Sequence, residues 1–154
     1  MSFKKSEHTV GEMTISGLDV GGVTTENVSA LVIKDYPHYQ FAGIWGDGKK
    51  MVLYIDAHLE KDDVYDIGPG EEGSVGRVSY EDGKKYYDGR SGTITITEFN
   101  GELQQVSVYV DVLLGRDGSE ESIAVRIKGA FKGFDMHGKD SPEALALIKS
   151  ARIS

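Results

Sequence analysis

An alternation of apolar and polar residues between Ser91 and Gly133 constrains the fold of this chain more than any other feature. Residues 93–97 read TITIT, so that every second side chain is apolar. The next run carries its apolar residues on one parity, at Val106, Val108, Val110, Val112 and Leu114. A third run does the same at Ile123, Val125, Ile127 and Phe131. A period of two with many β-branched residues predicts three consecutive antiparallel strands that each bury one face.

The first turn of this meander can be predicted from the parity of its strands, because residues opposite one another in an antiparallel pair share a face. A two-residue Asn100-Gly101 turn would set apolar residues against polar ones. We therefore expect a three-residue turn that pairs Ile96 with Val106 and puts Gly101 in the left-handed conformation.

The second turn leaves two alternatives open. An Asp117-Gly118 turn and a Gly118-Ser119 turn both keep the apolar faces matched. The second alternative would place Asp111 opposite Arg126.

The rest of the chain adds more strands and one helix. Further alternating runs bring the total to about nine strands, which predicts an all-β fold, either an antiparallel β-sandwich or a closed β-barrel. Residues 141–152 begin with Ser-Pro-Glu and carry an apolar stripe that includes Leu145 and Ile148. This pattern predicts a C-terminal α-helix docked on the sheet. The length of 154 residues suits a single domain, residues 1–154.

Composition excludes several classes of function. The chain has no cysteine, which excludes disulfides, thiol catalysis and thiolate metal sites. The formal net charge of −8 argues against nucleic acid as a partner, because its phosphates would be repelled unless a basic patch existed locally. No apolar stretch resembles a signal peptide or a membrane span, so we expect a cytoplasmic protein. The chain has no nucleophile elbow, P-loop or HExxH motif, and nothing in it predicts a cofactor.

The stretch between Glu60 and Glu72 is acidic and lacks a regular pattern. Its candidate binding residues are the carboxylates Asp62, Asp63, Asp66, Glu71 and Glu72. Their spacing does not match a calcium-binding EF-hand loop. We interpret the stretch as a charged loop that can engage a basic partner, since long loops often carry binding sites.

Aromatic residues define a second candidate surface. A two-residue Asp82-Gly83 turn would put Tyr87 opposite Val78 and leave Tyr86 on the other face. Exposed Tyr and Trp stack on sugar rings and anchor protein interfaces. The candidate residues are Trp45, Tyr86, Tyr87, Arg90 and Tyr109. Ordinary packing of half-buried aromatics on strands also accounts for them, and we favour that interpretation.

Asp56 and His58 lie two residues apart on an expected strand, so they point the same way. A histidine and a carboxylate can bind a divalent metal or share a proton. No HxH or HxxxH pattern supplies a further ligand, so we interpret the pair as a solvated strand face and expect no metal.

Arg126, Lys128 and Lys132 align on the outer face of the last expected strand. Such a row could meet an acidic partner. Basic residues also guard an edge strand against aggregation, and we favour that interpretation.

We therefore hypothesise a non-enzymatic binding protein. The first-ranked version is a small acidic inhibitor or immunity-type protein that neutralises a basic protein partner. One alternative is a barrel or sandwich that binds a sugar or a small apolar molecule. A second alternative is an enzyme that uses Asp56 and His58. Exposed edge strands would also allow the chain to form oligomers.

Overall fold

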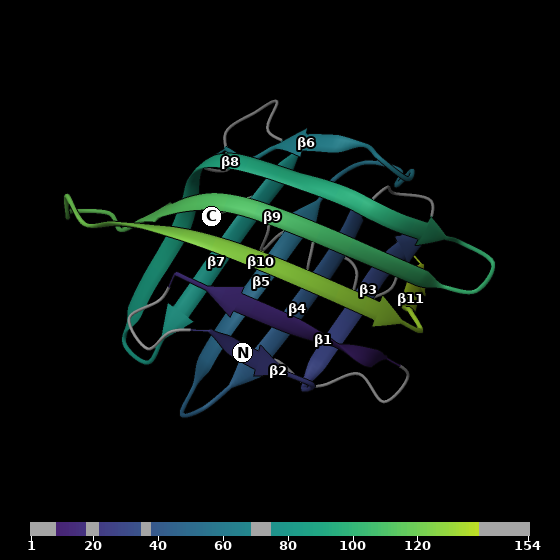
Figure 1. The fold of residues 1–154 in the computed structure, drawn as a ribbon, viewed down its shortest axis with the longest axis horizontal. Coiled ribbons are helices and arrows are strands. Elements are labelled where there is room, and N and C mark those ends of the chain that lie inside the picture. The colour runs from purple at the N-terminus through teal and green to yellow at the C-terminus, as the bar shows by residue number, and fades with distance from the viewer. Residues whose placement is uncertain (1–8, 18–21, 35–37, 69–74, 139–154) are drawn as a thin grey trace.

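The computed structural model describes residues 9–17, 22–34, 38–68 and 75–138, which form eleven β-strands and no helix (Figure 1). The strands are β1 (Val10–Ser16), β2 (Val23–Thr25), β3 (Val28–Lys34), β4 (His38–Trp45), β5 (Lys49–Ile55), β6 (Val64–Asp66), β7 (Gly76–Asp82), β8 (Lys85–Asn100), β9 (Gln105–Gly115), β10 (Ser122–Lys132) and β11 (Asp135–Gly138). The expectation of an all-β fold is confirmed for these residues. The helix predicted over residues 141–152 lies outside them.

All the described strands belong to one sheet that curls into an open half-barrel. Its order is β11-β3-β4-β5-β7-β8-β9-β10-β1-β2, and β6 pairs with β8. The ladders between strands are antiparallel except that β11 runs parallel to β3. In Figure 1 the layer containing β9, β10 and β1 crosses in front of the layer containing β3, β4 and β5. The strand pairing thus shows a barrel-like sheet that stays open, in place of the closed barrel or sandwich we expected.

The concave side of the sheet is filled by apolar side chains. The expected inward faces of β9 and β10 are confirmed, because Val110, Leu114 and Ile127 are fully buried. They belong to one core cluster with residues of β4 and β5, among them Phe41 and Leu53. Burial of this apolar area is the main favourable contribution to folding. The middle of the half-barrel is therefore packed core.

Hydrogen bonds at two corners hold the curl in place. The Thr25 hydroxyl donates to the carbonyl of Ile44 at 2.7 Å, which ties the end of β2 to β4. The Thr9 hydroxyl donates to the carbonyl of Gly133 at 2.7 Å and accepts from the amide of Ala30 at 3.3 Å. These bonds join the two layers at places where the chain passes between them.

The strand count differs from the expected nine for two reasons. The run at 93–97 and a further alternating run expected at Lys84 to Asp88 join into the single 16-residue strand β8. Three short strands, β2, β6 and β11, were not expected. Strands of three or four residues are too short to show a period of two, so pattern alone does not reveal them.

The β8–β9 turn contradicts the predicted three-residue turn. It spans residues 101–104, Ile96 pairs with Val108, and the left-handed residue is Gln104 (φ 51°), not Gly101. A bulge after Ile96 keeps the apolar faces matched despite the change of register. The backbone and side-chain oxygens of Gln104 accept amide hydrogen bonds from the segment after β10, at 2.8 and 3.0 Å. These tertiary contacts offset the strain of a left-handed glutamine.

The β7–β8 turn also differs from the prediction. Tyr87 pairs with Tyr80 and not with Val78, so the turn lies at Gly83-Lys84. Gly83 has a φ of 62°, as the first central residue of a type II′ turn requires.

The β9–β10 hairpin has the register of the Gly118-Ser119 alternative, with Asp111 opposite Arg126. Pairing nevertheless stops at Gly115 and Ser122, so a longer loop replaces the two-residue turn.

Candidate functional site

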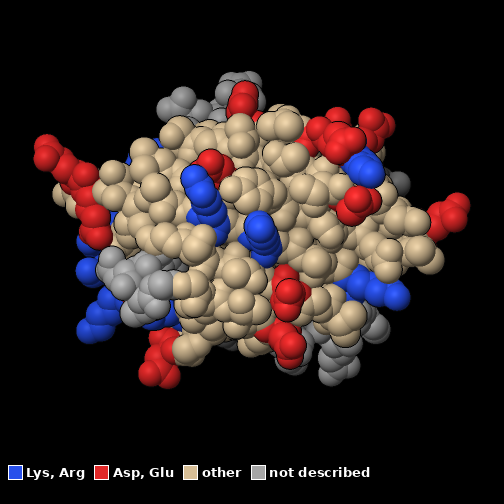
Figure 2. Space-filling view, in the orientation of Figure 1, with Lys and Arg blue, Asp and Glu red and all other residues tan. Residues whose placement is uncertain are grey.

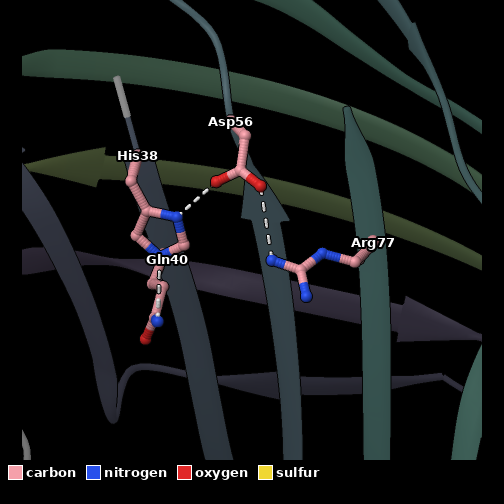
Figure 3. A network of polar contacts seen from close by, with 4 residues as sticks. All are labelled: His38, Gln40, Asp56 and Arg77. Atoms are coloured by element: carbon pink, nitrogen blue, oxygen red, sulfur yellow. Dashed lines mark hydrogen bonds and ion pairs between the residues drawn. The ribbon is translucent and has the colours of Figure 1, made fainter. Parts of the chain in front are cut away.

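A network of four polar side chains lies on the outer side of the sheet, at one end of β4, β5 and β7 (Figure 3). Asp56, just after β5, is at its centre. Its Oδ1 lies 2.5 Å from His38 Nδ1, and its Oδ2 lies 3.4 Å from Arg77 Nη2. Gln40 Nε2 lies 3.0 Å from His38 Nε2. The pairing of β4 with β5 and of β5 with β7 brings these residues onto one face.

A neutral His38 with its proton on Nδ1 satisfies both contacts of the ring. Nδ1 then donates to the Asp56 carboxylate, and Nε2 accepts from the Gln40 amide. The His38 side chain is 1% exposed. A catalytic histidine must offer a nitrogen to the substrate, and here both ring nitrogens are already engaged. In this arrangement the network joins strands and leaves His38 no free base for chemistry.

Arg77 contacts the second carboxylate oxygen of Asp56, on the side away from His38 (Figure 3). Its guanidinium lies over the ring of Tyr54, 5.1 Å from the ring centre, as in a cation–π contact. Burial raises the pKa of Tyr54, while a hydrogen bond with Ser79 and the charge of Arg77 lower it by smaller amounts. Tyr54 is therefore protonated at neutral pH.

The structure pairs Asp56 with His38 and does not bring it together with His58. Strand β5 ends at Ile55, so the alternation that would align the two side chains does not continue. His58 is exposed, and its carbonyl accepts a 2.8 Å hydrogen bond from the Tyr65 hydroxyl. Within the described residues no three histidines or carboxylates are grouped so that they could hold a metal ion.

His38, Gln40 and Arg77 were missed as site residues. The signal for the first two was their shared parity on β4, opposite to that of the core residue Phe41. Their link to Asp56 required knowledge of the strand pairing.

The acidic stretch forms part of an exposed edge of the sheet, which we call the acidic edge. Its residues are Glu60, Asp62, Asp63, Asp66 and Glu98. The amide of Asp62 donates to the carbonyl of Ile96 at 2.7 Å, and the amide of Ile96 donates to the carbonyl of Asp63 at 2.9 Å. These bonds continue the β6–β8 pairing and bring the loop beside Glu98. Glu71 and Glu72 lie outside the described residues.

The acidic edge is exposed apart from the half-buried Asp63, and it contains one lysine. Lys61 Nζ lies 3.5 Å from Glu98 Oε1. Figure 2 shows acidic side chains gathered around a basic one at the upper right of the molecule. Within the edge, partial burial and the nearby Asp63 carboxylate raise the pKa of Tyr65 to about 12.

The structure separates the aromatic candidates. Trp45 and Tyr87 face the core, where Tyr80 lies between them, with ring centres 5.9 and 5.7 Å away. Tyr86 is 48% exposed on the outer side of β8, and Tyr109 is half-buried on the outer side of β9. The five candidates therefore do not form a common sugar-binding surface.

Arg90 is engaged by carboxylates and not by aromatic rings. Its Nη2 lies 2.8 Å from Asp117 and 3.2 Å from Asp88. The hydrogen bond to Asp117 and the charge of Asp88 raise the pKa of Arg90.

The basic row of Arg126, Lys128 and Lys132 is exposed, as expected, but it does not guard an edge. Strand β10 lies inside the sheet, between β9 and β1. The interpretation that these basic residues protect an edge strand from aggregation is therefore wrong.

None of the described elements is a helix able to cross a membrane. Comparisons of this chain with protein-family models, with curated proteins and with solved structures found no match.

Proposed function

We propose that this chain is a non-enzymatic protein-binding module that recognises a basic partner protein through the acidic edge. The observation that carries the proposal is the gathering of five carboxylates from two separate segments along β6 and β8, with Lys61 among them. A formal net charge of −8 adds a long-range attraction for a basic protein.

The acidic edge also offers an apolar contact. Val64, at the start of β6, is 58% exposed and lies between Asp63 and Tyr65. Interfaces commonly surround a small apolar centre with charged groups, and the centre supplies the affinity that screened charges lack.

The closed polar network favours this function over the enzyme alternative. His38 is buried and both of its ring nitrogens have partners, so an Asp–His mechanism has no free base there. The packed core of the half-barrel likewise gives no support to a ligand held in its interior.

The test starts with affinity capture from a native lysate at low and moderate salt, with bound proteins identified by mass spectrometry. The partner is then purified, and its affinity is measured against an acidic-edge variant (Asp62→Asn, Asp63→Asn, Asp66→Asn and Glu98→Gln). Neutralising four carboxylates should weaken binding by about tenfold or more at low salt, mainly through the association rate. The difference should shrink as salt screens the charges.

A matched control variant removes the same charge elsewhere on the surface. It carries Glu12→Gln, Glu26→Gln, Glu102→Gln and Glu120→Gln, all at exposed positions. If both variants bound the partner equally well, net charge and not the acidic edge would explain the attraction, and the proposal would fail.

A further inference from the structure

The outer face of β8, β9, β10 and β1 carries a depression made of two adjoining grooves. These open grooves, of about 540 and 410 Å³, share Ser107 and Ala130 in their linings. Lys132 lines the first groove, and Lys128 and Tyr109 line the second. We call this combined depression the trough.

The sequence explains why the sheet is hollow at this point. Ser107 pairs with Ala130, so two small side chains face outward side by side in the middle of the sheet. The neighbouring outward pair on one side is Tyr109 and Lys128. On the other side Lys132 pairs with Gln105, and these longer side chains form the two ends of the hollow.

The lysines of the trough have neutral cross-strand neighbours. Lys128 lies opposite Tyr109 on β9 and opposite Thr14 on β1. Lys132 lies opposite Gln105 and Val10. Among the residues that the structure describes, neither lysine lies within ion-pair distance of a carboxylate. Figure 2 shows basic side chains projecting from the middle of this broad face, with acidic side chains close to them.

Two carboxylates also line the grooves and limit the positive charge. Glu12 lies opposite Ala130 on β1, and Glu98 lies opposite Ser107 on β8, so one carboxylate flanks each side of the middle of the trough. An anionic ligand must therefore lie along β10, where the cations are. Lys128 and Lys132 are four residues apart on an extended strand, roughly 13 Å.

We propose that the trough binds an anionic oligosaccharide, one that carries carboxylate or sulfate groups. The two lysines would pair with two anionic groups along the sugar chain. The hydroxyls of Thr14, Ser107 and Tyr109 would hydrogen-bond to sugar hydroxyls, and the Tyr109 ring offers a face for sugar stacking.

An acidic peptide fits the trough less well than a sugar does. Peptides often bind a sheet by adding a strand, which requires free backbone donors and acceptors at a sheet edge. Strands β9 and β10 each pair with a neighbour on both sides, so their backbone is already used. Recognition in the trough must therefore rest on side chains, and a hydroxyl-rich ligand suits them.

The experiment titrates the full chain with a galacturonic acid oligomer and with a sulfated heparin oligosaccharide, by calorimetry at low salt. A neutral galactose oligomer and polyglutamate serve as comparison ligands. At least one anionic sugar should bind saturably, while the neutral sugar and polyglutamate should bind much more weakly. Absence of binding by both anionic sugars, or equal binding of polyglutamate, would overturn the proposal.

Variants locate the binding on the protein. Lys128→Gln combined with Lys132→Gln should weaken sugar binding by about tenfold at low salt. The matched control, Lys84→Gln with Lys85→Gln, removes the same charge at the exposed β7–β8 turn and should bind like the wild type. Circular dichroism verifies that both variants are folded. Equal binding by the two variants would place the sugar elsewhere. Both variants keep the acidic edge, so this outcome is independent of the proposed protein partner.

Discussion

Asp56 is the residue on which the outer polar network depends, because its two oxygens contact both His38 and Arg77. His38 is buried and has no solvent to replace a lost partner. Asp56 itself is 33% exposed, so part of its interaction with Arg77 is screened by water. The bond to buried His38 is therefore the contact whose loss should cost the most.

We predict that Asp56→Ala lowers the free energy of unfolding by about 1–3 kcal/mol, because it leaves the buried His38 donor without its acceptor. Urea denaturation at neutral pH measures this change. Asp111→Ala, at an exposed position on β9, is the control and should change stability by no more than about 0.5 kcal/mol. Equal stability of the two variants would contradict a stabilising role for the network.

At the residue scale, the sequence indicated Asp56 correctly as a member of a histidine–carboxylate pair, but it indicated His58 and not His38 as the partner. His58 is two positions away, and proximity in sequence suggested it. His38 is 18 positions away and comes beside Asp56 through the pairing of β4 with β5. A local pattern contains no information about which distant strand becomes the neighbour.

At the element scale, β8 pairs with different neighbouring strands along its length. Residues 85–88 pair with β7, and residues 93–95 pair with β6. The register with β9 shifts between Gly89 and Ser91, where the strand changes neighbours. Gly92 follows with a φ of 135°, and a Cβ there would lie 2.0 Å from the carbonyl oxygen of Asp111.

We predict that Gly92→Ala destabilises the protein by more than about 2 kcal/mol, since the methyl group would collide with the backbone of β9. Thermal or urea denaturation measures the loss. Gly101→Ala is the control, because a Cβ at Gly101 has only ordinary contact with Phe99, at 3.6 Å. A wild-type stability for Gly92→Ala would show that β8 can shift its backbone without penalty.

The long strands were predictable as elements, while the short ones were not. The inward faces of β9 and β10 follow from their period of two, and the structure confirms them. Strand β6 has three residues and exists because β8 offers it a partner. The sequence therefore indicated the acidic residues around β6 as candidates, but it did not predict β6, the strand that aligns them along β8.

At the scale of the whole molecule, the packing of tyrosines makes stability sensitive to alkaline pH. Burial is the largest cause that raises the pKa of Tyr39, Tyr54, Tyr65, Tyr86 and Tyr87. An unfolded tyrosine ionises at a pKa of about 10, before its folded counterpart does. Above that pH the unfolded state loses protons that the folded state retains, so the unfolded state is favoured.

We predict that the free energy of unfolding falls as pH rises from about 10 toward 12, the range between the unfolded pKa of tyrosine and the folded pKa of Tyr65. Tyr65→Phe should make this fall less steep, because one of the shifted groups is removed. Urea denaturation at successive pH values gives the slope, and tyrosinate absorbance follows the ionisation. An unchanged slope in Tyr65→Phe would contradict the prediction.

From the order of residues alone it follows that this chain forms strands, which faces of the long strands point inward, and that cysteine chemistry is absent. These properties are local, because a two-residue repeat assigns each side chain to a face without reference to the rest of the chain. The tertiary structure alone decided that the sheet stays open and that β10 lies inside it. It also decided that Asp56 meets His38 and that Ser107 and Ala130 leave a trough between lysines. Such contacts join segments far apart in sequence, and long-range packing selects them among many pairings that satisfy the same local pattern.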